Sequence, residues 1–406
     1  MNRRNFIKLS AIGMLPIFSS SCGVLRIDPN HYLLRSPYID SPEDEKRILS
    51  KAKLEWSEDG RIRVLHLSGN HYEMGYQHGA LLREEVQKNM LFLYNHALEK
   101  FRFEELFAEI YERMRPYIPQ EYIDEMQGLA HGSRLPLHVV HHIHILPELG
   151  EWSGKKRLKK VLDKMMAGDL AQTCSNFCLD NKATEDNEFY AIRILDWGMH
   201  RFSKLHEYPL ITVCKPDKGI PYSNISWVGF VGAVSGMNAE GITLGEMGYG
   251  DPPNETLFGE PMPFMLRDIL SKAKNLADVK NIIQNSKPTC SFVFLMSDGK
   301  TKESEIYVRD PDRFLVFKAG ERLKDKKEDI PPINNILYGG HYNDRMTENL
   351  NKNNGKINLE MLQKELIPKF AMPSNFQNVI YKPAKLQFWV SNAKSKSEWA
   401  ASQPYT

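Results

Sequence analysis

The amino-acid sequence predicts an α+β protein, in which helices and strands form separate layers. Helical periodicity comes first, short β-like runs dominate after residue 173, and no βα unit repeats with a fixed period. A repeating βα unit would favour a parallel, doubly wound sheet instead. The sequence also contains no internal repeat and no glycine-rich phosphate-binding loop. We therefore expect sheets covered by layers of helices.

The composition is that of a folded globular protein. The chain has 406 residues, 42% of them hydrophobic and 26% charged, with 53 basic against 51 acidic side chains. A net charge of +2 gives no indication of a nucleic acid or an acidic polymer as partner. Five cysteines are too few for a disulfide framework. These values exclude a disordered or fibrous chain, while the length allows one large domain or several smaller ones.

Residues 1–22 predict an export signal. A pair of arginines precedes an apolar stretch, Leu9 to Phe18, and three serines then lead to Cys22. The apolar stretch is too short to span about 30 Å of hydrocarbon as a helix. The arginine pair resembles the twin-arginine signature, and the serine-rich end resembles a lipobox that would place a lipid on Cys22. We expect an exported, membrane-anchored lipoprotein, periplasmic or on the surface; the alternative is a cleaved signal whose cysteine has no role.

The part of the chain that follows the signal is predicted to be mostly helical. We expect a polar tether over residues 23–60 and an N-terminal helical segment over 61–173. Residues 61–67 alternate polar and apolar side chains, as an exposed edge strand does. Apolar side chains three and four residues apart predict helices over two ranges, 72–115 and 120–144.

Strands dominate the predicted core, residues 174–406. Residues 174–179 and 188–195 flank a turn-rich segment, which predicts a β-hairpin. Further strand-like runs cover 209–214, 225–234, 242–247, 290–296, 303–309 and 314–318, with a turn at 237–241. A helical pair over 263–284, a helix over 359–370 and a hairpin around 382–385 complete the pattern.

The candidate chemistry lies on the predicted hairpin. Cys174 begins one strand, and Arg193 and Asp196 end the other, so antiparallel pairing brings a thiol, a cation and a carboxylate to one corner. A guanidinium lowers the pKa of a neighbouring thiol, and a carboxylate can orient the base that takes its proton. The sequence places no histidine as that base. If the chain were cut before Cys174, the freed α-amino group, with an ordinary pKa of about 8, could serve.

These motifs together resemble the N-terminal nucleophile hydrolases of the choloylglycine hydrolase and acyl-coenzyme A:6-aminopenicillanate acyltransferase group, and the C45-type autoproteolytic branch in particular. The resemblance runs from about residue 61 to 320, and more weakly to the end. The residues that carry it are Gly69 to Gly79 at a helix start, Glu125 to Gly132, Cys174-Ser-Asn-Phe, Arg193-Ile-Leu-Asp-Trp and Gly236 to Gly241.

The resemblance implies a four-layer αββα sandwich and a cut at the Thr173–Cys174 bond. The α fragment, 61–173, and the β fragment, 174–406, would pack as one domain. The implied activity is hydrolysis of linear acyl amides, at C–N bonds other than peptide bonds, through a thioester on Cys174. Its freed amine would be the base, Asp196 would hold that amine, and Arg193 would lie beside the thiolate. No cofactor and no metal are implied.

Two positions depart from the family pattern. The Thr-Asn-His motif, whose asparagine donates into the oxyanion hole, falls on Gly339-Gly340-His341, and an expected arginine has no match near Lys356. Losing one oxyanion donor costs about 10²–10³ in rate. The missing donor favours, as one alternative, a lipoprotein that binds acylated molecules without turnover. Acyl transfer to an amine is the other alternative, because the sequence does not separate it from hydrolysis. The substitute oxyanion or second-layer candidates are Asn238, Tyr249 and Asn343.

Each of these residues also has a purely structural interpretation. Cys174 would then be a buried inert thiol, and Arg193 and Asp196 a structural ion pair. Cys178 shares the strand face of Cys174 and is expected in the core. Four histidines (His138, His141, His142 and His144) have zinc-compatible spacing, and four methionines (Met237, Met247, Met262 and Met265) could line an acyl pocket, but core packing is expected for both sets. Lys155 to Lys160 is expected to be a solvated connector, with anionic lipid head groups as the alternative contact.

Overall fold

The computed structural model describes residues 39, 41–101, 104–151, 174–201, 203–249, 256–325 and 328–406. The predicted export signal with Cys22, and Thr173 before the predicted cut, lie outside these ranges. Lipid attachment and chain cleavage therefore remain predictions.

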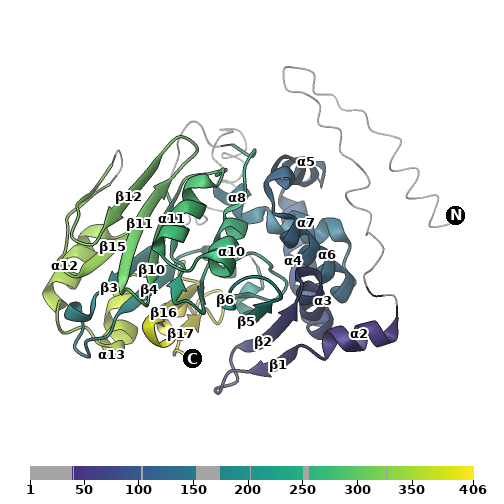
Figure 1. Ribbon diagram of the computed structural model, residues 1–406, viewed down its shortest axis with the longest axis horizontal. Coiled ribbons are helices and arrows are strands. Elements are labelled where there is room, and N and C mark those ends of the chain that lie inside the picture. Colours follow the sequence, from purple (N-terminus) through teal and green to yellow (C-terminus); the bar gives the residue numbers. More distant parts are fainter. Residues whose placement is uncertain are drawn as a thin grey trace.

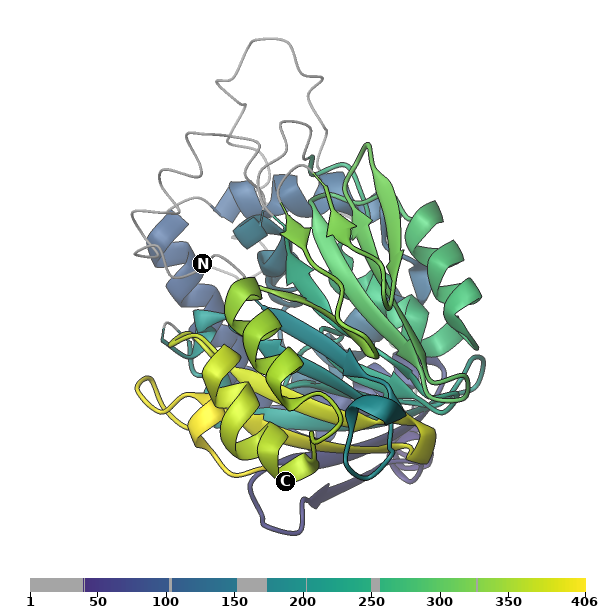
Figure 2. The same ribbon diagram turned by 90° about the vertical axis from the view of Figure 1, so that its left-hand side faces the viewer.

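Two sheets pack face to face, and helices cover their outer faces, which confirms the predicted αββα layers (Figures 1 and 2). The large sheet has the order β1 (Lys53–Trp56), β2 (Arg63–Gly69), β5 (Pro209–Pro216), β6 (Tyr222–Trp227), β7 (Gly236–Asn238), β8 (Ile242–Thr243), β10 (Phe292–Asp298), β11 (Glu303–Arg309) and β12 (Phe314–Lys318), and β9 (Glu246–Gly248) pairs with β10. The small sheet has the order β15 (Ile336–Gly340), β3 (Ser175–Leu179), β4 (Tyr190–Leu195), β16 (Gln377–Lys382) and β17 (Gln387–Asn392). A separate ribbon joins β13 (Leu323–Lys324) to β14 (Asp329–Ile330).

The helices fall into three groups. The N-terminal group, of which α3 lies beside β2 in Figure 1, comprises α3 (His71–Leu81), α4 (Arg83–Phe101), α5 (Glu104–Met114), α6 (Gln120–Ser133), α7 (Leu137–His144) and α8 (Leu146–Glu151). The large sheet carries α10 (Met262–Lys272) and α11 (Leu276–Asn285), and the small sheet carries α12 (Asn343–Asn353), α13 (Leu359–Met361) and α14 (Ile367–Phe370). Within the described ranges, none of these helices combines the length and apolarity needed to cross a membrane.

The glycine motifs at 69–79 and 125–132 form a close helix crossing. A Cβ added at Gly75 would overlap the backbone carbonyl oxygen of Glu125, and one added at Gly128 would overlap that of Tyr72. The α3 and α6 backbones therefore touch where any side chain would separate them. Asn70 starts α3, because its side chain accepts a hydrogen bond from Glu73 N at 2.9 Å.

The structure corrects the predicted N-terminal boundaries. The range expected to be a tether, 23–60, contains α2 (Pro42–Leu49) and β1. Ser41 caps α2 by accepting a hydrogen bond from Asp44 N at 3.1 Å, and Ile48 packs on Tyr72 and Tyr76 of α3. Because β1 pairs with β2, the edge strand is β1, and β2 lies between β1 and β5.

For the rest of the chain, the predicted type of element, helix or strand, is confirmed more often than its predicted bounds. The hairpin of β3 and β4, the helices over 72–115 and the pair α10 and α11 are confirmed. The strand expected over 225–234 ends at Trp227, and the turn expected at 237–241 begins inside β7. The elements β15 and α12 were not predicted from the sequence.

Candidate functional site

The hairpin brings the three predicted site residues together. In the register of β3 and β4, Asn176 lies opposite Arg193, while Cys174 directly precedes β3 and Asp196 directly follows β4. Cys174 is 2% exposed, and Arg193 and Asp196 are 0% exposed. The charges of Arg193 and Asp196 both act on the Cys174 thiol. The three side chains therefore lie close together, as the hairpin predicts, and they are shielded from solvent.

Cys174 faces the space between the two sheets. Side chains of a strand alternate between faces, and Phe177 packs against Phe370 of α14 on the outer face, with ring centroids 5.7 Å apart. Asn176 lies on the inner face, where its Nδ2 donates to Glu246 O of the large sheet at 3.2 Å. Cys174 precedes Asn176 by two residues and shares that inner face.

Arg193 has a partner that sequence reasoning missed. Its Nη2 donates to Glu246 Oε2 at 3.0 Å, and both side chains are fully buried. Burial raises the pKa of the Cys174 thiol to about 12, against the opposing effect of Arg193, and the Glu246 charge raises this pKa further. In the uncut chain the thiol is therefore protonated at neutral pH. The only local signal for Glu246 was an acidic residue inside an apolar run, and its partner lies 53 residues away.

One carboxyl oxygen of Asp196 is hydrogen-bonded, and the other has no partner among the described residues. Its Oδ1 accepts hydrogen bonds from Asn375 Nδ2 at 2.9 Å and from Met372 N at 3.1 Å. Its Oδ2 is buried without a partner in the described part of the chain. Burial raises the pKa of Asp196 to about 8, although hydrogen bonds and Arg193 oppose this. The carboxyl group is thus fixed in orientation and protonated at neutral pH in the uncut chain, and one of its oxygens has no partner among the described residues.

Asn375 is the second residue that sequence reasoning missed. It lies just before β16, and the next residue binds the small sheet through Phe376 N, which donates to Leu195 O at 2.7 Å. The Asn375 side-chain oxygen accepts from Ala401 N at 2.7 Å. A loop near the C-terminus therefore fixes the carboxylate that follows β4.

The position of the expected oxyanion asparagine has no room for a side chain. Gly340 lies opposite Ser175 in the register of β15 and β3. A Cβ added at Gly340 would overlap Ser175 Oγ and would lie 2.6 Å from Ser175 Cβ. Asn343 is already committed here: its Oδ1 accepts from Gly340 N at 2.9 Å, and its Nδ2 donates to Glu328 Oε2 at 2.9 Å.

The other two oxyanion candidates are also used elsewhere. Asn238 Nδ2 donates to Ala273 O at 2.8 Å, and its Oδ1 accepts from Ile242 N at 3.0 Å, so this side chain stabilises the turn between β7 and β8. The Tyr249 hydroxyl donates to Asp325 Oδ2. These contacts, and those of Asn343, do not support the oxyanion roles of the three residues, which stay predictions.

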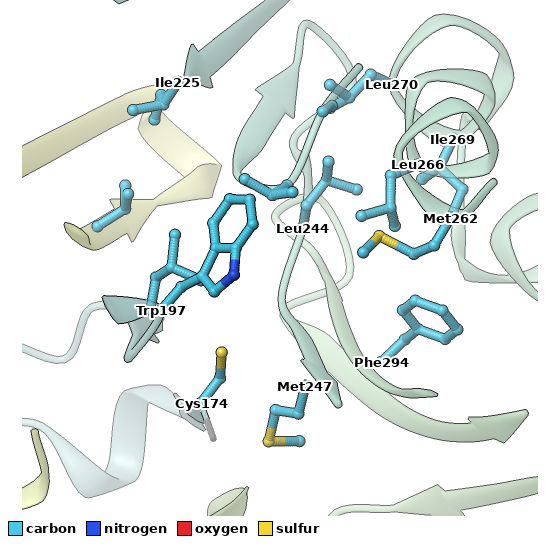
Figure 3. Packing of buried hydrophobic residues seen from close by; sticks show 14 of the residues in the cluster. Cys174, Trp197, Ile225, Leu244, Met247, Met262, Leu266, Ile269, Leu270 and Phe294 are labelled. Atoms are coloured by element: carbon cyan, nitrogen blue, oxygen red, sulfur yellow. The ribbon is translucent and has the colours of Figure 1, made fainter. Parts of the chain in front are cut away.

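Apolar side chains line the other side of Cys174. Figure 3 places the Cys174 side chain between Trp197 and Met247 in its view, at the edge of the buried apolar cluster. Trp197 contacts Trp227 edge to face, with centroids 6.3 Å apart, and Trp227 stacks on Phe376 at 4.6 Å. The Cys174 thiol therefore lies between polar side chains on one side and apolar side chains on the other.

The core positions expected for Cys178 and for most of the histidine and methionine sets are confirmed, whereas Lys155 to Lys160 lies outside the described residues. Cys178 is buried, and burial raises the pKa of its thiol. His141 stacks on Tyr111 at 4.2 Å, and His144 Nε2 accepts from Val231 N at 2.8 Å. In the residues that the structure describes, no three His, Cys, Asp or Glu side chains are grouped as metal ligands. The four candidate methionines are all buried: Met237, Met247, Met262 and Met265.

No protein-family model matches the chain. Among curated proteins, Protein dcd1B of Dictyostelium discoideum is 25% identical over 285 residues, which cover 64% of this chain and 53% of that protein. An uncharacterized protein of Archaeoglobus fulgidus is 26% identical over 295 residues, covering 66% of this chain and 47% of that protein. The chain therefore spans about half the length of the curated relatives it matches.

Solved structures give distant matches. The Caenorhabditis elegans ortholog of N-acylethanolamine-hydrolyzing acid amidase has a TM-score of 0.40 and 13% identity, covering 52% of this chain and 93% of that chain. A mutant of conjugated bile acid hydrolase from Clostridium perfringens has a TM-score of 0.32, 11% identity and coverages of 54% and 89%. Penicillin V acylase from Agrobacterium tumefaciens has a TM-score of 0.31, 10% identity and coverages of 54% and 83%. At these values no substrate or mechanism transfers to this chain.

Proposed function

We propose that this protein is an autoproteolytic N-terminal nucleophile amidase of the C45-like kind, which hydrolyses linear acyl amides through a thioester on Cys174. One observation carries the proposal: Asp196 is fixed through Oδ1, and its buried Oδ2 has no partner within the described ranges. A buried polar atom without a partner is costly. An ammonium group at the start of β3, created by a cut before Cys174, would satisfy it.

The cut itself uses the same thiol. The Cys174 sulfur attacks the carbonyl carbon of Thr173, the C–N bond breaks, and the thiol proton passes to the nitrogen that becomes the α-amine. Water then hydrolyses the thioester, which leaves a carboxylate on Thr173 and restores the thiol. The fragments would stay together because contacts between them are buried, including Glu125 on α6 with Arg267 on α10 at 2.9 Å.

Turnover would repeat this chemistry on an acyl amide. The freed amine, in its neutral form, takes the thiol proton, and the sulfur attacks the substrate carbonyl. The amine returns the proton to the departing nitrogen, and it then activates the water that releases the acid. Arg193 would stabilise the thiolate, and Glu246 would hold that guanidinium in place. The apolar side chains Trp197 and Met247 suit an apolar acyl group.

Two measurements test the proposal. Intact-mass spectrometry of mature wild-type protein should give two chains, one beginning at Cys174, and Cys174→Ala should give one. The cut protein should release amines from at least one of N-acyl amino acids, conjugated bile acids and penicillin V. A folded wild-type protein that stays uncut would remove the proposed base. Cut protein without turnover of any linear amide would refute the amidase activity.

A binding protein without catalysis is the second candidate. The observation that favours it is Gly340, where neither an asparagine nor any other side chain fits beside Ser175. A thiol-reactive acyl probe separates the two functions, because only the amidase should label Cys174 faster than Cys178. Acyl transfer would differ from hydrolysis only in an added amine competing with water for the thioester. Product analysis with and without hydroxylamine distinguishes those two outcomes.

We also propose that the protein is exported and anchored to a membrane through a lipid on Cys22, on the basis of the sequence of residues 1–22. Metabolic labelling with an alkyne fatty acid should tag the wild type. The Cys22→Ala variant should carry no label and should no longer be found in the membrane fraction. Labelling that persists in this variant would contradict the anchor.

A further inference from the structure

Several buried polar atoms lack partners among the described residues, and four of them lie around the inner face of β3 and β4. They are Asn176 Oδ1, Arg193 Nε, Asp196 Oδ2 and Glu246 Oε1, and each belongs to a side chain that is 0% exposed. Buried polar groups in native proteins are nearly always hydrogen-bonded. Asp196 Oδ2 is assigned above to the freed amine, which leaves one donor and two acceptors for a bound molecule.

The geometry of Asn176 fixes which way its oxygen points. Its Nδ2 donates to Glu246 O at 3.2 Å, so the reversed amide would place two oxygen atoms against each other. Two of its neighbours, one from each sheet, are glycines, which place backbone and no side chain beside the amide. Gly339 lies opposite it on β15, and a Cβ added at Gly245 would lie 3.1 Å from Asn176 Oδ1.

A secondary amide complements the unpartnered atoms. Its carbonyl oxygen accepts a hydrogen bond, and its N–H donates one, whereas an ester or a tertiary amide has no N–H to donate. A molecule whose carbonyl carbon meets the Cys174 sulfur must enter on the face that Asn176 shares. Glu246 is already paired with Arg193, so Asn176, which directly follows Cys174-Ser175 and lies on β3, provides a neutral acceptor that has no partner among the described residues.

We propose that Asn176 is a specificity-determining residue, whose Oδ1 accepts the N–H of the scissile amide and selects secondary amides over esters and tertiary amides. This inference rests on the amidase activity proposed above. A site built to bind a substrate N–H discriminates against analogues that lack it, because its own acceptor is then left buried without a partner. Removing the acceptor should therefore lower the rate with amides and leave the rate with esters in place.

The experiment compares three substrates with one acyl group: decanoyl p-nitroanilide, its N-methyl derivative and the decanoyl p-nitrophenyl ester. Asn176→Ala should lower kcat/KM for the anilide by about 10- to 100-fold, the effect of one lost hydrogen bond in a buried site. The value for the ester and for the N-methyl anilide should change by less than about 3-fold. The anilide-to-ester ratio is the readout, because damage to the fold lowers both rates together.

Asn224 provides a matched control. It is 1% exposed on β6, its Nδ2 donates to Gly232 O at 3.2 Å, and its Oδ1 also lacks a partner in the described chain. Asn224→Ala therefore removes the same groups away from Cys174 and should leave the anilide-to-ester ratio unchanged. If Asn176→Ala fails to fold, Asn176→Ser replaces it and should change the ratio in the same direction.

Three outcomes separate the hypotheses. A selective loss of anilide turnover in the Asn176 variant supports the inference. Equal losses with anilide and ester overturn it and leave the amidase proposal intact. Wild-type protein that turns over none of the three substrates and forms no decanoyl thioester on Cys174 refutes the proposed function, and this inference with it.

Discussion

At the residue scale, the Arg193 guanidinium interacts with two acidic groups, the Glu246 carboxylate and the Cys174 thiol. Only the thiol is proposed to react with substrate. Glu246 is ion-paired with the guanidinium at 3.0 Å, and the Cys174 thiol interacts with the guanidinium through both charge and a hydrogen bond. The guanidinium favours the thiolate, whereas the Glu246 charge disfavours it. The ion pair therefore balances two effects on one thiol, and each can be changed separately.

The first prediction concerns the pKa of Cys174. Glu246→Gln removes a negative charge and should lower this pKa, while Arg193→Met removes the positive charge and should raise it. Thiolate absorbance near 240 nm, titrated against pH in folded protein, measures both shifts, with Cys174→Ala as the blank. Shifts of the same sign in the two variants would contradict the electrostatic account.

The second prediction concerns Asp196 in the uncut chain. Its pKa is about 8 in the fold, above its ordinary value of 3.8, so between these values the folded chain keeps a proton that the unfolded chain loses. Stability should therefore fall as pH rises from 4 to 8, by about 1.4 kcal/mol per pH unit from this group. Urea unfolding of Cys174→Ala should show that slope, and Asp196→Asn in the same background should lack it. If the stability of the two variants changed with pH in the same way, the raised pKa of Asp196 would be contradicted.

At the element scale, the crossing of α3 and α6 shows packing overriding helix propensity. Alanine is favoured over glycine in a helix by about 1 kcal/mol. At Gly75 and Gly128, however, an added Cβ would overlap a backbone carbonyl oxygen of the other helix, and a backbone atom cannot move aside as a flexible side chain can. The two helices must separate to accept it.

The third prediction follows from this crossing. Gly75→Ala should lower the free energy of unfolding by about 1–3 kcal/mol, the usual cost of overpacking, instead of raising it. Gly75→Ala with Gly128→Ala should cost less than the sum of the two single changes, because the first already separates the helices. Chemical unfolding of all three variants measures this. A stabilised Gly75→Ala protein would show that the backbones are not in contact.

At the scale of the whole molecule, a loop over residues 228–234 joins the N-terminal helices to the sheets. Gly229 N donates to His78 Nε2 at 2.9 Å, and Val231 N donates to His144 Nε2 at 2.8 Å. Asn89 Nδ2 donates to Val228 O at 2.7 Å. Both imidazoles act as acceptors, which requires them to be neutral. Burial lowers the pKa of each to about 4, against the opposing charge of Glu125.

The fourth prediction is the acid sensitivity of this contact. The unfolded chain takes up protons near pH 6.5 and the folded chain only near pH 4, so stability should fall as pH drops through this window, by up to about 3 kcal/mol for each histidine. The charged groups facing both imidazoles are Glu125 and Arg267. A glutamine side chain keeps a hydrogen-bond acceptor but does not titrate. His78→Gln and His144→Gln should therefore reduce the loss of stability at acid pH.

Hydrogen exchange measures this effect at the amides concerned. Exchange at Gly229 and Val231, corrected for intrinsic rates, should accelerate below pH 6 in the wild type and less so in the glutamine variants. His66→Gln is the control, because His66 is 40% exposed and pairs with Glu55 on the β1–β2 ribbon. A control variant that changes the acid response as much as His78→Gln would contradict the assignment.

The sequence by itself determined the features that depend on neighbouring residues. Alternation and a turn-rich segment predict the hairpin of β3 and β4, and pairing within that hairpin brings Arg193 and Asp196 to Cys174. Three- and four-residue spacing predicts the helices that precede it. These signals are local because a strand or helix exposes its periodicity within a few residues.

Only the tertiary structure decided which groups complete the site. Glu246 reaches Arg193 across 53 residues, and Asn375 reaches Asp196 across 179. The stacking of two sheets and the docking of a C-terminal loop create both contacts, and neither leaves a periodic trace in the sequence. Asn238 and Asn343 accept hydrogen bonds from backbone groups four and three residues away, and the pairing of β15 with β3 closes the space at Gly340. A side chain's type states what it can bind, but its hydrogen-bond partners are set by whatever the folded backbone places within about 3 Å.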